Sequence, residues 1–133
     1  METEDVVHVL RHVHQALGPG GRLLDIHPLG IDMPVRAGSR GLGFVDASEF
    51  ALVVGAMNDA VEQVVAEGLL EEERVLRRTV VERFDDAAEA LEEADGWTNL
   101  RLPAAVRRRL VEAEERPVEF VDTVRYRLFR TTG

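Results

Sequence analysis

The sequence predicts a layered α/β domain with three strands and four helices. Two observations support this fold class. Hydrophobic residues alternate between helical spacing and short apolar runs, in the order helix, strand, helix, strand, helix, helix, strand. The chain has 133 residues, of which 45% are hydrophobic, and this is enough for one core. We therefore expect a single domain over residues 1–133.

The first predicted elements are a helix and a strand joined by a glycine-rich turn. Over residues 4–17 the hydrophobic residues are spaced by four, three and four positions, the pattern of an amphipathic helix: Val6, Leu10, Val13 and Leu17. The sequence Gly18-Pro-Gly-Gly21 is suited to end this helix. The short apolar run 22–27 follows and stops at Pro28, which favours a strand.

The middle of the chain predicts a loop, a long helix and an edge strand. Residues 29–45 include five glycine and proline residues and are expected to form a flexible surface loop. Helical spacing returns over residues 47–70. Residues 74–84 combine β-branched side chains with arginine and glutamate, which is the composition of a protected edge strand.

The last third of the chain predicts two short helices and a strand. Asp85 and Asp86 are suited to cap an acidic helix that ends near Asp95. Pro103 stands where a second helix begins, because proline is favoured at the first helical position. Hydrophobic residues then alternate with others over residues 118–130, which predicts a long strand.

The composition excludes several function classes. There is no Cys, which excludes a disulfide scaffold, thiolate zinc sites and a cysteine nucleophile. The formal net charge is −9, with 25 acidic and 16 basic residues, so we expect no nucleic-acid partner. No apolar run reaches the roughly 18–20 residues of a membrane span, and the first residues are acidic rather than basic as in a signal peptide. These features predict a cytoplasmic protein without a membrane partner.

The segment from Val6 to His27 resembles part of the class I S-adenosylmethionine-dependent methyltransferases. In that family a helix ends in the motif L-x-P-G-G-x-L and runs into the fifth strand of the sheet. The corresponding residues here are Leu17-Gly-Pro-Gly-Gly-Arg-Leu23. The resemblance implies the carboxyl-terminal half of a Rossmann-like domain, with a three-stranded mixed sheet in the order 22–27, 118–130, 74–84.

The resemblance also implies that the chain lacks a cofactor site of its own. The family binds its cofactor on a glycine-rich turn after the first strand and on an acidic residue that ends the second strand, and this chain contains neither. The cluster Gly38-Ser-Arg-Gly41-Leu-Gly43 follows a predicted loop instead of a strand, so we interpret it as part of that loop. We expect no cofactor in the isolated chain, and S-adenosylmethionine only if a partner completes the domain.

Three functions remain open. The first is a methyltransferase-like partial domain without a cofactor site, acting through self-association or through a partner chain. The second is S-adenosylmethionine-dependent methyltransferase activity, once a missing amino-terminal half completes the domain. The third is a small-ligand-binding α/β module that uses the loop 29–45 and Trp97.

His27, at the end of the first predicted strand, is a candidate site residue. Open α/β sheets bind ligands at the carboxyl ends of parallel strands, and Asp25 lies two residues earlier on the same side. This pair is suited to act as a general base, and a capping role beside Pro28 is the alternative. His8 and His12 have the spacing of metal ligands but lack the intervening Glu of a metalloprotease, so we expect no metal site.

Four further residues are candidates for substrate binding. Arg36 and Arg40 in the predicted loop are suited to bind a carboxylate or phosphate, with solvated arginines as the alternative. The resemblance places Trp97 and Asn99 near the substrate. The alternative for Trp97 is that it anchors its loop onto the core.

The predicted strand 22–27 is expected to mediate association. In the resemblance this strand has lost its neighbour, and a free apolar edge recruits another strand. We expect a twofold homodimer, or else a complementary methyltransferase half as partner. Replacement of Leu24 or Ile26 by Lys is then expected to give monomeric or insoluble protein.

Overall fold

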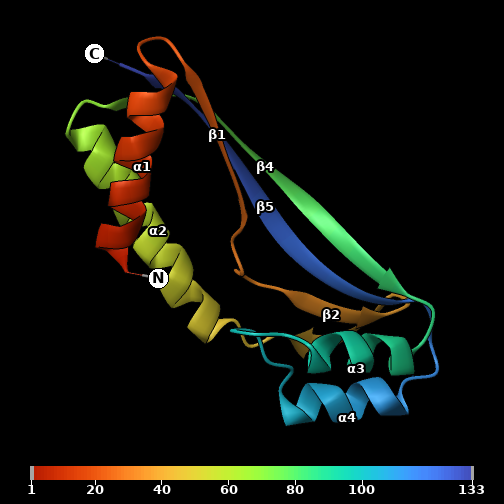
Figure 1. Cartoon of the computed structure of the whole chain (residues 1–133). Coiled ribbons are helices and arrows are strands. Elements are labelled where there is room, and N and C mark those ends of the chain that lie inside the picture. Colours follow the sequence, from red (N-terminus) through yellow and green to blue (C-terminus); the bar gives the residue numbers. More distant parts are fainter. Residues whose placement is uncertain (1, 133) are drawn as a thin grey trace. The chain divides into compact units, whose positions relative to one another are not determined.

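The computed structural model describes residues 2–132 and shows helices and strands in mixed order along the chain (Figure 1). The elements are α1 (Thr3–Leu17), β1 (Arg22–Pro28), β2 (Pro34–Ala37), β3 (Arg40–Phe44), α2 (Ser48–Ala66), β4 (Leu70–Phe84), α3 (Ala87–Asp95), α4 (Ala104–Glu112) and β5 (Val118–Thr131). Within residues 2–132, no helix is both long and apolar enough to cross a membrane.

The chain divides into two compact units. Unit 1 contains the described residues up to His27, Leu52–Arg78 and those from Val124 onward. Unit 2 contains Pro28–Ala51 and Thr79–Thr123. Because α2, β4 and β5 contribute residues to both units, the single domain expected from the sequence stays a prediction.

The sheet is antiparallel, and the predicted partial Rossmann-like domain with a three-stranded mixed sheet is wrong. Five strands are present, in the order β1-β5-β2-β3, with β4 also paired to β5. In unit 1 the N–H of Thr131 donates to the carbonyl of Gly21 over 2.9 Å, and in unit 2 the N–H of Leu29 donates to the carbonyl of Thr123 over 2.8 Å. As the residue number rises on β1 it falls on β5, so these strands run in opposite directions.

The strands expected at 22–27, 118–130 and 74–84 are present, and β5 pairs with the other two. A Rossmann-like sheet needs parallel strands joined by helical crossovers. Here β1 is followed by two short strands joined by a tight turn, and such a turn joins only antiparallel neighbours. The difference from the predicted fold class therefore starts in residues 29–45.

The prediction of a flexible loop at 29–45 is wrong, because this segment contains a β-hairpin. β2 and β3 pair antiparallel, with Ala37 opposite Arg40. Gly38 stands in the two-residue turn with a φ of 59°, a left-handed conformation that glycine adopts without strain. Val35 is completely buried, so the hairpin forms part of the core of unit 2.

In unit 1, the helices α1 and α2 cover one face of the sheet segment formed by β1, β4 and β5 (Figure 1). The core of this unit is formed by buried hydrophobic side chains from α1, α2, β4 and β5: Val6, Val7, Ala60, Val61, Val64, Leu70 and Phe129. The helix α2 ends at Ala66 rather than at the predicted residue 70, because Gly68 turns the chain with a φ of 79°.

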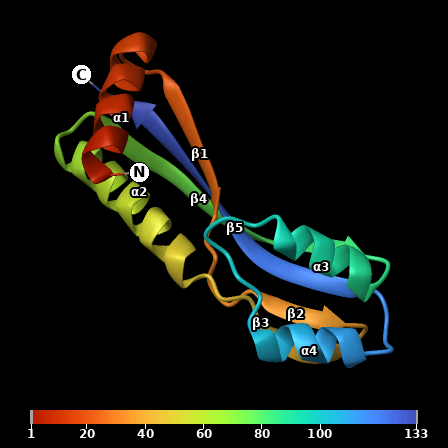
Figure 2. The same cartoon turned by 60° about the horizontal axis from the view of Figure 1, so that its bottom comes forward.

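In unit 2, α3 and α4 pack on the hairpin and on the first part of β5 (Figure 2). The predicted cap of the acidic helix is confirmed, because Asp86 Oδ1 accepts a hydrogen bond from the N–H of Glu89 over 3.0 Å. The core of this unit is formed by hydrophobic side chains: Met33, Val35, Ala37, Leu42, Val45, Ala90, Ala94, Leu102, Val106, Leu110, Val118 and Phe120.

The strand β5 buries different residues of its pleat in the two units. In unit 2 the buried residues Val118 and Phe120 lie on one side of the pleat, and the buried Val121 lies on the other. In unit 1 the buried residues Arg127 and Phe129 lie on the other side. The predicted apolar face of this strand is therefore fully buried only in unit 2, and Tyr126 is half-buried.

Candidate functional site

The five predicted site residues do not form one site. His27 belongs to unit 1, whereas Arg36, Arg40, Trp97 and Asn99 belong to unit 2. Within unit 2 the two arginines lie on the hairpin, one on each strand. Trp97 and Asn99 line a common pocket, so only these two are brought together.

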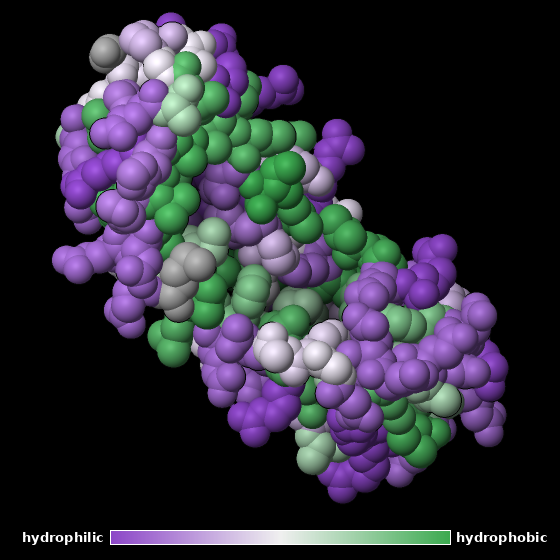
Figure 3. Space-filling view, viewed as in Figure 1, coloured by the Kyte–Doolittle hydropathy of each residue, from purple (hydrophilic) through white to green (hydrophobic). Residues whose placement is uncertain are grey.

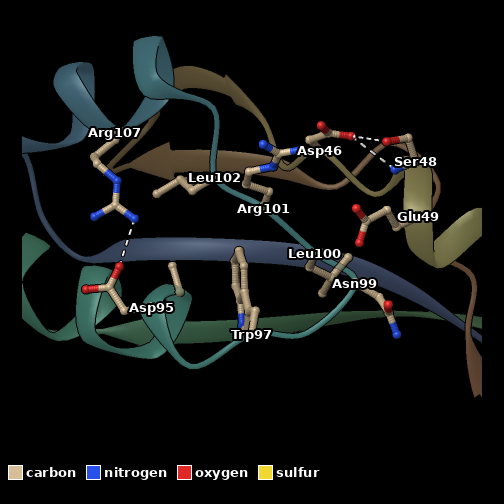
Figure 4. A pocket seen from close by; sticks show the side chains of 11 residues that line it. Asp46, Ser48, Glu49, Asp95, Trp97, Asn99, Leu100, Arg101, Leu102 and Arg107 are labelled. Carbon is tan, nitrogen blue, oxygen red and sulfur yellow. Dashed lines mark hydrogen bonds and ion pairs between the residues drawn. The ribbon is translucent and has the colours of Figure 1, made fainter.

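One pocket of unit 2 has a volume of about 350 Å³ and lies between the start of α2, the end of α3 and the segment before α4 (Figure 4). Its lining carries charges of both signs: Asp46, Ser48, Glu49, Ala94, Asp95, Trp97, Asn99, Leu100, Arg101, Leu102 and Arg107. Arg107 Nη2 donates to Asp95 Oδ1 over 2.9 Å across one end of the pocket. Both side chains of this ion pair are partly exposed, so water screens their attraction.

Asp46 stands at the other end of this pocket and organises the start of α2. Its Oδ1 accepts hydrogen bonds from the hydroxyl of Ser48 over 2.7 Å and from the N–H of Ser48 over 3.0 Å. Both bonds hold the pKa of Asp46 below its ordinary value, and the bond from the hydroxyl has the larger effect. The backbones of Asp46 and Arg101 also pair. Asp46, like Asp95, thus already has partners within the chain.

Trp97 and Asn99 both have structural roles in the segment that carries them. The ring of Trp97 lies 5.1 Å from the ring of the buried Phe120, measured between centroids, so Trp97 anchors its loop to the core. Asn99 adopts a left-handed φ of 66°, which asparagine tolerates better than most residues, and its carbonyl accepts the N–H of Phe50 over 3.1 Å. Substrate binding by these two residues stays a prediction.

Arg36 and Arg40 both face glutamates of unit 2. Arg36 Nη2 lies 3.7 Å from Glu119 Oε1, and Arg40 Nη1 lies 3.9 Å from Glu115 Oε1. The Nε of Arg36 is buried and has no hydrogen-bond partner. A carboxylate or phosphate ligand would have to compete with these glutamates, and its binding by the two arginines stays a prediction.

In unit 1, His27 and Asp25 belong to a chain of polar contacts with two further residues. His27 Nδ1 lies 3.1 Å from Asp25 Oδ1, and His27 Nε2 lies 3.1 Å from Arg125 Nη2. The same nitrogen of Arg125 donates to Asn58 Oδ1. His27 is only 7% exposed, so this polar cluster, made of Asp25, His27, Asn58 and Arg125, extends into the interior of the unit.

The guanidinium of Arg125 sets the direction of the hydrogen bonds at the His27 ring. A guanidinium only donates hydrogen bonds, so Nε2 accepts and Nδ1 donates to Asp25. Arg125 therefore occupies the nitrogen that a general base would use. Burial lowers the pKa of Arg125, and the positive charge of Arg127 lowers it further. The polar cluster is therefore better arranged to hold Asp25 in place than to remove a proton from a substrate.

A second arginine of the same unit, Arg127, is buried. Its Nη2 donates to Glu62 Oε1 over 3.0 Å and also to Glu72, and its guanidinium lies 4.9 Å from the ring centre of Phe129. Burial disfavours its charge, but the hydrogen bonds to Glu72 and Glu62 outweigh burial and raise the pKa of Arg127. Two carboxylates thus neutralise the charge inside unit 1.

On β1 the residues Leu23, Asp25 and His27 lie on the inner face, whereas Leu24 and Ile26 lie on the outer face. Leu24 and Ile26 alternate with Asp25 and His27, and their side chains are 53% and 52% exposed. β1 is the last strand in the sheet order, and its outer edge pairs with no strand among residues 2–132. Figure 3 shows hydrophobic side chains gathering at the surface beside α1. This part of unit 1 has both features of an association surface, a free edge and exposed apolar side chains.

Sequence reasoning missed the arginines that shape both sites. In unit 2 these are Arg101 and Arg107, which follow Trp97 along the chain and carry no distinctive motif. In unit 1 they are Arg125 and Arg127. Their signal is present in the sequence, because two arginines occupy alternate positions of a strand and therefore share one face.

No group of three or more metal-binding side chains lies close together within residues 2–132. Comparisons of the chain with models of protein families, with curated proteins and with solved structures find no match.

Proposed function

We propose that this chain is a methyltransferase-like partial domain without a cofactor site of its own, and that it acts by associating with a second copy of itself through β1. The observation that carries the proposal is the combination of a free strand edge with exposed Leu24 and Ile26. Edges of this kind pair with further strands unless charges, prolines or bulges protect them. In β1 the terminal residues Arg22 and Pro28 and the inward-pointing Asp25 are of the protecting kind, whereas Leu24 and Ile26 are not.

A second copy suits this edge geometrically. Two copies of one strand pair antiparallel about a twofold axis, so that each free N–H and C=O of the edge meets the same strand in the partner. Leu24 and Ile26 then lie beside their counterparts. About half of each side chain is exposed, so burying all four contributes about 3–6 kcal/mol before the entropy of association is subtracted.

The methyltransferase part of the proposal is supported by the order of the elements. The helix, glycine turn and strand of the motif correspond to α1, residues 18–21 and β1, and β5 pairs with both β1 and β4. Neither feature requires a parallel sheet. In this proposal S-adenosylmethionine is bound only when a complementary half is present. The proposal keeps the expected cytoplasmic location, with no nucleic-acid or membrane partner.

Sedimentation velocity over a range of concentrations tests the proposal. The unmodified chain is expected to form a dimer, and Leu24→Lys or Ile26→Lys is expected to give a monomer with unchanged circular dichroism. The matched control is Leu52→Lys, because Leu52 is 76% exposed on α2 of the same unit. This control introduces the same charge away from β1 and is expected to stay dimeric. A monomer for the unmodified chain at high concentration contradicts self-association and favours a complementary methyltransferase half.

A second candidate function, small-ligand binding by unit 2, is favoured by the common pocket of Trp97 and Asn99. Trp97 is the only tryptophan, so its fluorescence reports ligand binding at this pocket directly. A saturable change on titration with S-adenosylmethionine would favour this candidate and contradict the absence of a cofactor site. Unchanged fluorescence is the result that the leading proposal predicts.

A further inference from the structure

The outer face of the sheet in unit 1 carries a pocket, which we call the β4–β5 pocket. It has a volume of about 320 Å³ and lies on the strands β1, β5 and β4, of which β5 is the middle one (Figure 1). Its lining combines hydrophobic side chains and a tyrosine with two arginines, and includes no carboxylate: Leu24, Arg74, Leu76, Arg78, Tyr126 and Leu128. Such a lining is complementary to an apolar molecule that carries a negative charge.

The β4–β5 pocket lies on the face of the sheet that α1 and α2 leave uncovered. Phe129 of β5 packs in the core with these helices, and side chains alternate along a strand, so its neighbour Leu128 points to the opposite face. On the same face Leu24 is 53% exposed and Leu76 is 39% exposed. Hydrophobic side chains that gather on an exposed face indicate a binding surface, whereas single ones do not.

The two arginines of the β4–β5 pocket both come from β4. Arg74 and Arg78 stand on either side of Leu76, and because alternate residues of a strand share a face, all three line the pocket. Within residues 2–132 neither arginine forms an ion pair with a carboxylate. Both guanidiniums therefore keep their donors available to a ligand.

The glutamates that precede these arginines on β4 are engaged elsewhere. Glu71 Oε2 lies 2.7 Å from Arg130 Nη2, and Glu73 Oε1 lies 3.0 Å from Arg22 Nε. The acidic side chains of this part of β4 thus pair with arginines of β5 and β1. They do not neutralise the positive charge of the pocket.

We propose that the β4–β5 pocket binds a small amphipathic carboxylate, whose apolar part lies on the hydrophobic lining and whose carboxylate is bound by Arg74 or Arg78. The planar guanidinium suits a carboxylate because it donates two parallel hydrogen bonds to the two oxygens. The net charge of −9 repels anions over a distance, so a preference for the anion reports the local arginines. This proposal does not rest on association through β1, because both arginines lie on β4.

Three probes of similar size and different charge test the proposal: 4-phenylbutanoate, 4-phenylbutan-1-ol and 4-phenylbutan-1-amine. Each is titrated into the full chain at a concentration where sedimentation finds a single species, because Leu24 also belongs to the proposed association surface. Tyr126 is the only tyrosine and Trp97 the only tryptophan, so the NMR signals of their rings report the β4–β5 pocket and the pocket of unit 2 separately.

The carboxylate is expected to shift the ring signals of Tyr126 and to leave those of Trp97 unchanged. It is expected to bind about threefold to tenfold more tightly than the alcohol, because water weakens hydrogen bonds to exposed arginines without abolishing them. The amine is expected to bind most weakly. Equal affinities for the three probes, no binding of the carboxylate, or shifts confined to Trp97 would overturn the proposal.

Two changes with neighbouring controls locate the binding. The double variant Arg74→Gln, Arg78→Gln is expected to abolish the preference for the carboxylate, whereas Arg77→Gln keeps it, because Arg77 points to the other side of β4. Leu76→Ala is expected to weaken binding of all three probes, whereas Val75→Ala, also on the other side, leaves it unchanged. An undiminished preference in the double variant, or an equal loss in Arg77→Gln, would overturn the proposal.

Discussion

Unit 1 and unit 2 both consist of helices packed on antiparallel strands, but they differ in whether charged side chains are buried. In unit 2 the buried side chains are hydrophobic, and ion pairs such as Arg107 with Asp95 lie at the surface. The buried polar side chains, His27, Arg127 and Thr131, all belong to unit 1. Unit 2 therefore has an ordinary core, whereas unit 1 keeps charge inside.

The difference is sharpest along β1. Its inner face carries the polar Asp25 and His27 beside Leu23, while Leu24 and Ile26 are left half-exposed on the outer face. Burial of apolar groups is the main stabilising contribution to folding, so this arrangement is unfavourable for an isolated unit. Such local conflicts are expected where a protein binds something. This contrast between the two units is consistent with the proposed association through β1 of unit 1.

The largest effect is expected from the hydrophobic side chains that each core needs. Phe129 of unit 1 and Leu110 of unit 2 are completely buried. Phe129→Ala is expected to lower the free energy of unfolding by about 3–5 kcal/mol, and Leu110→Ala by about 2–5 kcal/mol. Urea denaturation measures both, with Leu52→Ala as an exposed control. A loss below about 1 kcal/mol for Phe129→Ala would mean that unit 1 has no tightly packed core.

A smaller effect, specific to unit 1, is expected from removing the carboxylates that neutralise Arg127. The double variant Glu62→Gln, Glu72→Gln leaves a buried charge with neutral partners only, which is expected to cost about 1–3 kcal/mol of unfolding free energy. The matched variant in unit 2 is Asp95→Asn, which removes an exposed ion pair and is expected to cost less than about 1 kcal/mol. Equal losses in urea denaturation would remove the contrast between the two units.

The smallest effect is expected at Asp46 in unit 2. Its lowered pKa means that its ionised form contributes stability above the pKa of the unfolded chain, and that this contribution is lost as the pH falls through the lower pKa of the folded state. Ser48→Ala removes the hydroxyl donor, so the pKa of Asp46 is expected to rise towards its ordinary value. Titration of the carboxyl carbon signal by NMR measures this. An unchanged pKa in the variant would assign the shift to another cause.

The sequence predicted the helices and three strands because their signals are local. The spacing of Val6 to Leu17, the cap at Asp86 and the alternation over 118–130 each depend on neighbouring residues. The hairpin was missed because the five glycine and proline residues of the segment 29–45 were interpreted as a loop. The buried alternation of Val35 and Ala37 around the Gly38-Ser39 turn was the stronger signal.

The strand directions and the polar cluster were harder to predict. Parallel pairing was inferred from a resemblance, whereas direction depends on which strands meet across long separations in the sequence. The pairing of His27 with Asp25 was predicted because residues two positions apart in a strand lie on the same face. The contacts of Arg125 with His27 and Asn58 span 98 and 67 positions, and no local pattern indicates them.

Sedimentation equilibrium of the unmodified chain tests the central claim, association through β1, most directly. The mass is measured over a wide concentration range for the unmodified chain and for Leu24→Lys. Our account predicts twice the mass of one chain for the unmodified protein and the mass of one chain for the variant. The mass of a single chain for the unmodified protein at every concentration would contradict it.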